Sequence, residues 1–226
     1  MAVKNGAPYV GEQVDSILCQ LSFSDELIIS DDHSVDSTLD IVRSFNDPRV
    51  RVISSPRHGV ANNFEFALSH SSGDFIFLSD QDDVWHPNKV STMLPYFHDF
   101  DLVVCDCTLI SDEGSVLCDS FFEWNKSGKG FLRNLISNSY MGCCMGFSKR
   151  VLMKALPFPK KISIHDFWIG MVAEAHFRPV FLKDKLVSHR IHRANASTSG
   201  GPSNIPPLRR VRQRYQLVRN LISRSL

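Results

Sequence analysis

Short apolar runs and helical periodicities alternate along the first hundred residues. Apolar runs predict strands at residues 27–30, 49–54 and 75–78, and apolar positions three or four residues apart predict helices over 8–21, 36–45 and 59–70. This alternation with short loops predicts an α/β fold with a parallel sheet and right-handed crossovers. Residues 1–6 resemble the end of a strand without its body, so we expect the first strand to be a stub or the chain to start late.

Carboxylates follow two of these predicted strands at the point where each strand ends. Asp80, Asp82 and Asp83 come after the run 75–78, which we expect to be a central strand buried on both faces. Asp31 and Asp32 follow the strand before it. Ligands of α/β sheets bind at the carboxyl ends of the strands, and a divalent cation is one way to keep several adjacent carboxylates ionised. The alternative is a solvated turn that caps the helix beginning at Pro87.

The second half of the chain continues the pattern less regularly. We expect a helix over 88–97, strands at 101–110, 141–147, 179–183 and 187–191, and a helix running from Asp166 to His176. Residues 198–207 are rich in Gly, Pro and Ser and predict a linker, and 208–226 form a basic amphipathic helix. The chain is therefore interpreted as one domain over residues 1–200 and a tail over 201–226.

Composition removes several classes of function. The chain has 226 residues, 43% of them hydrophobic, and a net charge of +1, which gives no sign of a nucleic-acid partner. The six cysteines lack paired Cys-x-x-Cys spacing and no apolar run is long enough to span a membrane, so we expect reduced thiols and a cytoplasmic protein. Neither a P-loop nor a Gly-x-Gly-x-x-Gly turn is present.

Four ordered segments carry a resemblance to a known family: Lys4-Asn-Gly, Ser30 to Thr38, Gly73-Asp-Phe and Ser79 to Pro87. Together they resemble the family 2 glycosyltransferases, and within them the bacterial rhamnosyltransferase-like and polysaccharide-biosynthesis branch. The resemblance extends from residue 1 to about residue 200. It implies the GT-A fold, a Rossmann-like and mostly parallel sheet flanked by helices. It also implies transfer of a sugar, with inversion, from a nucleotide-diphosphate donor to a saccharide or lipid-linked acceptor.

The resemblance also implies roles for individual residues in the donor half, residues 1–100. Nucleotide or donor contacts fall to Val3, Asn5, Asp31, Asp32 and Asp82, and Asp83 is the expected ligand of Mg²⁺ or Mn²⁺. Such a metal neutralises the charge that builds on the departing diphosphate. In the closing segment, His192 matches a histidine that contacts the metal or the diphosphate, and Arg190 and Arg193 carry charge suited to phosphates.

In the acceptor half, residues 101–200, the resemblance assigns the chemistry to Asp166. It matches the family's general base, which takes the proton of the acceptor hydroxyl. His165 and Trp168 are expected to shape the acceptor pocket, and Trp124 is a candidate for stacking on a sugar ring. A plain helix N-cap accounts equally well for Asp166, and a packed loop for the aromatic residues near 124.

Two other functions remain open on the sequence alone. A sugar-phosphate nucleotidyltransferase also binds nucleotide and metal on an α/β sheet, and a catalytically silent sugar-nucleotide-binding protein would share the donor site. The tail helix over 208–226 has three candidate contacts, namely the domain itself, a partner helix and the anionic inner face of the cell membrane. The donor sugar and its base are not determined by the sequence.

Overall fold

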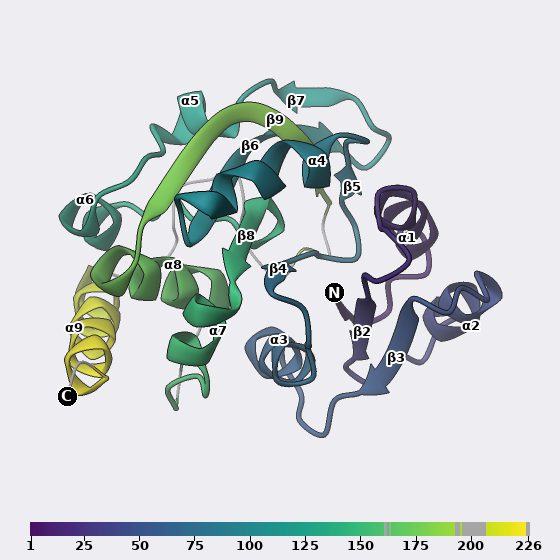
Figure 1. Ribbon diagram of the computed structural model, residues 1–226, viewed down its shortest axis with the longest axis horizontal. Coiled ribbons are helices and arrows are strands. Elements are labelled where there is room, and N and C mark those ends of the chain that lie inside the picture. Colours follow the sequence, from purple (N-terminus) through teal and green to yellow (C-terminus); the bar gives the residue numbers. More distant parts are fainter. Residues whose placement is uncertain (161, 163, 193–194, 196–206, 225–226) are drawn as a thin grey trace.

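The computed structural model describes residues 1–160, 162, 164–192, 195 and 207–224, and the side chains of 207–210 are not described. The first part of the chain forms a small parallel sheet with strand order β1-β2-β3, shown on the right of Figure 1. Its elements are β1 (Ala2–Val3), α1 (Val10–Leu18), β2 (Leu27–Asp31), α2 (Thr38–Ser44), β3 (Val50–Ser54) and α3 (Val60–Ser69). The predicted alternation of strands and helices is confirmed here.

The second sheet is mixed, with strand order β4-β8-β6-β9-β5 and β7 paired to β6. Its strands are β4 (Phe75–Phe77), β5 (Val84–Trp85), β6 (Leu102–Ser111), β7 (Val116–Cys118), β8 (Met145–Ser148) and β9 (Pro179–Ile191). Only β6 and β9 pair in parallel, with Leu102 opposite Pro179 and Ser111 opposite Ile191. The long curved β9 crosses the upper part of the molecule beside β6 (Figure 1).

The prediction for residues 75–78 is wrong in one respect. β4 pairs antiparallel with β8 and lies at one end of the mixed sheet, so it is not a central parallel strand. Phe75 is 44% exposed and stacks on Phe97 (ring centroids 4.6 Å apart), whereas Ile76 is buried. One face of the apolar run therefore packs on a helix at the surface and stays partly exposed. The pattern of apolar residue types does not distinguish this arrangement from burial on both faces.

Short helices fill the second half of the chain. They are α4 (Lys89–Met93), η1 (Leu94–His98), α5 (Phe121–Asn125), α6 (Phe131–Ile136), η2 (Gly142–Cys144), α7 (Lys149–Ala155), α8 (His165–His176) and α9 (Pro207–Ser223). The helix expected over 88–97 is split into α4 and the 3-10 helix η1. Pro95 has no N–H to continue the α-helical hydrogen bonds, so the chain goes on as a 3-10 turn. The strand expected over 141–147 begins instead with the 3-10 turn η2, which holds Cys143 and Cys144.

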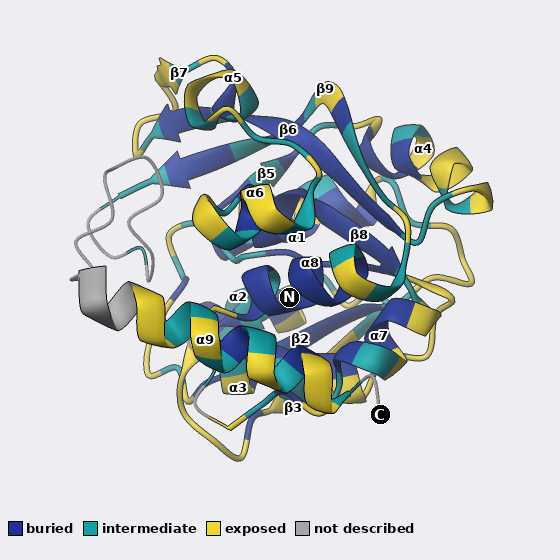
Figure 2. Cartoon of the chain, turned by 90° about the vertical axis from the view of Figure 1, so that its left-hand side faces the viewer, coloured by how far each residue is buried: buried dark blue, intermediate teal, exposed yellow. Residues whose placement is uncertain are grey.

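The C-terminal helix packs against the domain. Leu217 and Leu221 are buried, Arg214 lies over the Phe167 ring at 4.0 Å, and α9 contacts α8. Figure 2 shows α9 lying across the lower part of that face with an exposed outer side. The predicted linker at 198–207 lies outside the described residues apart from Pro207. None of the described helices combines the length and apolarity needed to cross a bilayer.

Candidate active site

The acidic turn, residues Asp80 to Asp83, joins β4 to β5 and lies against the end of β9. Asp83 is 1% exposed, and its Oδ1 lies 2.7 Å from His189 Nδ1 and accepts the Arg190 N–H at 3.1 Å. Its Oδ2 has no hydrogen-bond partner among the described residues. A buried carboxylate oxygen without a partner is costly, and a metal ion would satisfy it. Asp83 therefore fits the ligand role expected of it.

Charge around Asp83 keeps the carboxylate ionised. Burial works to raise the pKa of Asp83, but the attraction of His189 and its hydrogen bond outweigh burial, so the pKa is lowered. Burial by itself would lower the pKa of His189, but the Asp83 carboxylate raises this pKa well above its usual value. The two side chains form a buried ion pair at the base of the site.

Asp82 faces the segment after β9. His192 Nε2 lies 2.8 Å from Asp82 Oδ2, and Asn195 Nδ2 donates to the same oxygen at 3.4 Å. The His192 ring stacks on Tyr9 with centroids 4.8 Å apart. Burial and the neighbouring Asp83 raise the pKa of Asp82, and His192 opposes them. The sequence predicted that Asp82 and His192 share one site, and the structure brings them into contact; Arg193 lies outside the described residues.

Asp80 is the third carboxyl group of the turn. Burial, and then the charges of Asp83 and Asp82, raise the pKa of Asp80 to about 8, and Asp166 adds to the effect. Asp80 is therefore largely protonated at neutral pH unless a cation joins the cluster. Because Asp166 contributes to this shift, its carboxylate lies within electrostatic reach of the acidic turn.

The Arg190 side chain has three hydrogen-bond partners within the protein. Its Nε donates to the Asp82 carbonyl at 3.1 Å, one terminal nitrogen to the Asp112 carbonyl at 2.9 Å, and the other to Glu12 Oε2 at 2.8 Å. Arg190 is 6% exposed. Its guanidinium holds the acidic turn, α1 and the turn after β6 together, and the donor contact expected of Arg190 stays a prediction.

Gln81 connects the acidic turn to the loop after β1. Its side-chain Oε1 accepts the Lys4 N–H at 2.8 Å, and its Nε2 donates to the Lys4 carbonyl at 3.1 Å. A Cβ on Gly6 would lie 2.3 Å from Gln81 Oε1, so only glycine allows this approach. The side chain of Gln13, wholly buried on α1, donates to Ser79 Oγ at 2.7 Å. These contacts fix the acidic turn against the first sheet.

Asp32 occupies a separate cluster at the end of β2. Its Oδ1 lies 2.8 Å from His58 Nδ1, and its Oδ2 accepts from the Gly59 N–H at 2.9 Å and from Lys4 Nζ at 3.2 Å. Burial alone would raise the pKa of Asp32, but Gly59, His58, Lys4 and His33 lower it to about 2. Lys4, His33 and His58 are each more than half exposed, so this cluster borders solvent. The base contact expected of Asp32 stays a prediction.

The other residues predicted to contact the nucleotide donor lie near this cluster. Asp31 accepts the Ser34 N–H through both oxygens, at 3.2 and 3.1 Å. Val3 is 1% exposed and its carbonyl accepts the Asp32 N–H, so the structure places its side chain in the core and corrects the direct contact expected of it. Asn5, with φ of 49°, accepts the Val35 N–H through Oδ1 at 2.9 Å and remains exposed.

Asp166 lies in the first turn of α8, as predicted. Its Oδ2 accepts the Gly142 N–H at 3.0 Å and its Oδ1 the Phe167 N–H at 2.6 Å. A Cβ on Gly142 would come within 3.4 Å of His165 Nε2 and 3.5 Å of Asp166 Cβ, so η2 approaches this helix end closely. His165 is 8% exposed and stacks on Phe64, and burial lowers its pKa. Both residues lie where η2 meets α8.

The two predicted acceptor tryptophans lie in different environments. Trp168 is 1% exposed, and its indole N–H donates to the Ala155 carbonyl at 2.9 Å. It is a core residue, which corrects the acceptor contact expected of it. Trp124, on α5, is 49% exposed and packs beside Phe121. Its surface position is compatible with a contact to an acceptor.

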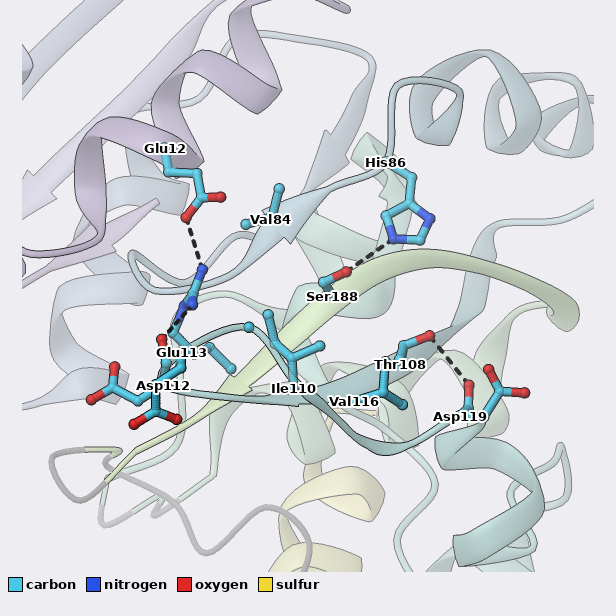
Figure 3. Close-up of a pocket in the computed structure, with 12 residues that line it drawn as sticks. Glu12, Val84, His86, Thr108, Ile110, Asp112, Glu113, Val116, Asp119 and Ser188 are labelled. Atoms are coloured by element: carbon cyan, nitrogen blue, oxygen red, sulfur yellow. Dashed lines mark hydrogen bonds and ion pairs between the residues drawn. The ribbon is translucent and has the colours of Figure 1, made fainter.

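A pocket of about 640 Å³ lies behind the acidic turn, between α1, β5, β9 and the β6–β7 hairpin (Figure 3). Figure 3 shows Glu12 and Asp112 at one end and Asp119 at the other, with His86 and Ser188 in contact across it. Arg190 lines it together with these carboxylates. Because Arg190 also donates a hydrogen bond to the Asp82 carbonyl, this pocket shares one wall with the acidic turn.

Sequence reasoning missed three residues that build the site, Gln81, His189 and Lys89. Lys89 is fully buried, donates to the Cys143 carbonyl at 2.6 Å and lies 3.8 Å from the Trp85 ring centre. The sequence did offer a signal for Lys89, because a lysine on the apolar face of a short helix is unusual. For His189 and Gln81 no local signal existed, since their partners are distant in the sequence.

Comparison with known proteins identifies related sequences. The chain is 32% identical over 122 residues to a chondroitin synthase from Pasteurella multocida, covering 52% of this chain and 13% of the relative. It is 26% identical over 161 residues to UDP-Glc:alpha-D-GlcNAc-diphosphoundecaprenol beta-1,3-glucosyltransferase WfgD from Escherichia coli, covering 69% and 60%. With dTDP-rhamnosyl transferase RfbG from Shigella flexneri it shares 31% over 102 residues, covering 42% and 35%. The chain thus spans less than two thirds of each of these relatives.

Solved structures share the fold. TarS from S. aureus in complex with UDP-GlcNAc has a TM-score of 0.74 at 18% identity, covering 99% of this chain and 64% of that one. The mannosyltransferase PcManGT from Pyrobaculum calidifontis, in complex with GDP-Man and Mn²⁺, has a TM-score of 0.62 at 18% identity, covering 85% and 56%. These similarities confirm the GT-A architecture expected from the sequence. The model of the family Glycosyl transferase family 2 matches residues 1–156, and the chain therefore belongs to glycosyl transferase family 2.

Proposed function

We propose that this chain is the catalytic domain of an inverting, metal-dependent glycosyltransferase that moves a hexose from a nucleotide-diphosphate donor. The observation that supports this most is the arrangement of four carboxyl groups. Asp80, Asp82 and Asp83 lie in the acidic turn. Asp166 accepts the Gly142 N–H at 3.0 Å, and Cys143, the next residue, lies beside Asp83 and His189. A metal ligand and a candidate base on either side of η2 suit the activation of a hydroxyl next to a departing diphosphate.

In this proposal residues 1–100 bind the donor. Asp32 accepts a hydrogen bond from the base, with Asp31 and Asn5 shaping its loop. Asp83 offers its partnerless Oδ2 to Mg²⁺ or Mn²⁺, and Asp82 and His192 lie beside it. The metal would neutralise the charge that develops on the leaving diphosphate. Mn²⁺ in the PcManGT complex supports a divalent ion at such a site.

Residues 101–200 bind the acceptor and hold the base. Asp166 takes the proton of the attacking hydroxyl, while the Gly142 N–H fixes the position of its Oδ2. A single proton transfer by a positioned carboxylate contributes roughly 10²–10⁴-fold to rate. His165, neutral because it is buried, presents a rigid surface beside this carboxylate, and Trp124 is exposed for contact with the acceptor.

The first test separates donor binding from chemistry. Calorimetric titration with UDP, dTDP and GDP, each with and without Mn²⁺, should give metal-dependent binding of one nucleotide. Asp83→Asn should abolish the metal-dependent part, and Asp99→Asn, at an exposed carboxylate, should leave it unchanged. Asp166→Asn should bind the same nucleotide but lose at least about 100-fold in acceptor-dependent turnover.

The outcomes distinguish the alternatives. Unchanged metal-dependent binding in Asp83→Asn would contradict the metal assignment. Donor binding without any sugar transfer by the wild-type protein would favour a silent sugar-nucleotide-binding protein. Formation of a nucleotide sugar from a sugar phosphate would favour a nucleotidyltransferase. Inversion is checked by the anomeric configuration of the first-formed product in the NMR spectrum.

The acceptor proposed is a saccharide or a lipid-linked saccharide, as in cell-surface polysaccharide synthesis. The name of the relative WfgD includes a diphosphoundecaprenol-linked sugar. On α9 the exposed residues Val211, Tyr215 and Ile222 lie within a sector of about 40° of the helix, at 3.6 residues per turn. The exposed residues Arg212 and Arg219 lie along one edge of this stripe. An exposed apolar stripe with a basic border suits peripheral contact with an anionic membrane surface.

Vesicle binding tests the membrane contact. The wild-type protein should cosediment with phosphatidylglycerol vesicles, and Val211→Ser with Ile222→Ser should reduce the bound fraction severalfold because the stripe loses its apolar area. Met153→Ser, at a residue 73% exposed on α7, is the matched control and should bind normally. Wild-type protein that stays in the supernatant at low salt would rule the contact out.

A further inference from the structure

A second group of metal-ligand side chains lies beneath the acidic turn. Asp83, Cys143 and His189 bring a carboxylate, a thiol and an imidazole together, with ligand atoms all within 4.8 Å of one another. These residues are 1%, 0% and 5% exposed. Mg²⁺ and Mn²⁺ prefer oxygen ligands, whereas thiolates and imidazoles select Zn²⁺. The donor metal therefore does not account for Cys143 and His189.

The distances are close to those of a tetrahedral zinc site. Zinc bonds of about 2.0 Å to nitrogen or oxygen and about 2.3 Å to sulfur separate nitrogen from sulfur by about 3.6 Å and nitrogen from oxygen by about 3.3 Å. His189 Nδ1 lies 3.7 Å from Cys143 Sγ and 2.7 Å from Asp83 Oδ1. Only the distance from His189 Nδ1 to Asp83 Oδ1 must widen, and a rotation of the Asp83 carboxylate would widen it. Asp83 Oδ2 has no hydrogen-bond partner among the described residues that would oppose this rotation.

The three ligands also balance the charge of the ion. Zn²⁺ with one thiolate, one carboxylate and a neutral imidazole carries no net charge, and a buried metal group without excess charge avoids most of the desolvation cost. Cys144 Sγ lies 4.0 Å from Cys143 Sγ but does not belong to the group of mutually close ligand atoms, so the site has three protein ligands and an open fourth position.

We propose that Asp83, Cys143 and His189 form a Zn²⁺ site that competes with the Mg²⁺ or Mn²⁺ site for Asp83. Binding releases the thiol proton of Cys143 and the proton shared by His189 and Asp83. Zn²⁺ binding does not depend on the transfer reaction. Its consequence does rest on the proposed function: Zn²⁺ turns Asp83 inward and removes it from the donor metal.

The test uses the full chain stripped of metal with a chelator. Co²⁺ should produce thiolate-to-cobalt charge-transfer absorption, and competition with a chromophoric chelator should give one tightly bound Zn²⁺. Cys143→Ser should lose this absorption and bind Zn²⁺ at least about tenfold more weakly. Cys19→Ser, at an exposed thiol, is the matched control and should keep both signals.

Two precautions keep the result unambiguous. Asp32, His33 and His58 form another possible metal group, so all proteins carry His58→Ala. Cys143→Ala is measured beside Cys143→Ser, with circular dichroism to check folding. Absence of the charge-transfer band in the His58→Ala protein at saturating Co²⁺ overturns the proposal, whatever the cysteine variants do. Unchanged Zn²⁺ affinity in a folded Cys143 variant does the same. Mn²⁺-dependent nucleotide binding is followed separately, so failure of the donor site is not confused with failure of the zinc site.

Discussion

His165 begins α8 with its ring stacked on Phe64, the ring centroids 3.9 Å apart. Its Nε2 is buried and has no hydrogen-bond partner among the described residues. Burial lowers the pKa of His165, so the folded protein favours the neutral ring more than the unfolded chain does. Charging this histidine therefore opposes folding.

We expect this residue to make stability depend on pH. Its contribution is fully present above the unfolded pKa near 6.5 and is lost as pH falls below that value, by at most about 1.4 kcal/mol per pH unit. His165→Phe keeps an aromatic ring and removes the proton site. Urea unfolding at pH 7.5 and 5.5 should show a smaller loss of stability in the variant. Equal losses in both proteins would contradict the prediction.

Single residues show what the sequence could predict about the site. Asp82 and Asp83 were predictable because carboxylates adjacent in sequence after a strand must share one loop. The surroundings of Arg190 and Trp168 were not predictable because residue type does not reveal which way a side chain turns. Arg190 meets two main-chain carbonyls and Glu12, and Trp168 meets the Ala155 carbonyl, and all of these contacts span distant parts of the chain.

At the scale of elements, two helices contain a glycine with opposite surroundings. A Cβ on Gly170 of α8 would lie 2.3 Å from the Tyr140 ring, and Tyr140 is buried and bonded to Glu174 Oε1 at 2.9 Å. A Cβ on Gly11 of α1 would meet only Ile41 Cγ2, at 3.5 Å. Close packing of α8 against the loop after α6 therefore requires Gly170, whereas α1 does not require Gly11.

Alanine at these two positions should change stability in opposite directions. Gly170→Ala should lower the free energy of unfolding by about 1–3 kcal/mol because the Tyr140 ring must move. Gly11→Ala should raise it by about 0.5–1 kcal/mol because the unfolded chain loses freedom in a helix-compatible position. Chemical denaturation of both variants measures this. A Gly170→Ala protein as stable as the wild type would show that the ring relocates freely.

The elements themselves were largely predictable, but their partners were not. Periodicity found α1 and α3, because each presents an apolar stripe to the core. α8 has no such stripe, since the residues 167–173 are all buried. The position of β4 was predicted wrongly because an apolar run does not specify its neighbour. β4 pairs with β8, which follows some seventy positions later, with Ile76 opposite Phe147.

At the scale of the whole molecule, Arg190 joins elements from the two ends of the chain. Its three side-chain contacts reach α1, the acidic turn and the turn after β6. Arg190→Ala removes the donor from the buried Asp82 carbonyl and from the partly buried Asp112 carbonyl and should cost about 3 kcal/mol. Glu12→Gln should cost less than about 1 kcal/mol because the Glu12 side chain is 60% exposed. Thermal unfolding compares the variants, and equal effects would mean that the ion pair rather than the carbonyl contacts carries the link.

The long β9 also sets the order in which a ribosome can complete this protein. β5 pairs only with β9 in the described sheet, and His189 follows Asp83 by 106 residues. A nascent chain that has not yet been synthesised as far as β9 already contains the carboxylates of the acidic turn. It does not yet contain His189 or Arg190, which contact these carboxylates in the folded protein. The contacts between the acidic turn and β9 are therefore among the last to form during synthesis, and a chain interrupted before β9 has the acidic sequence without them.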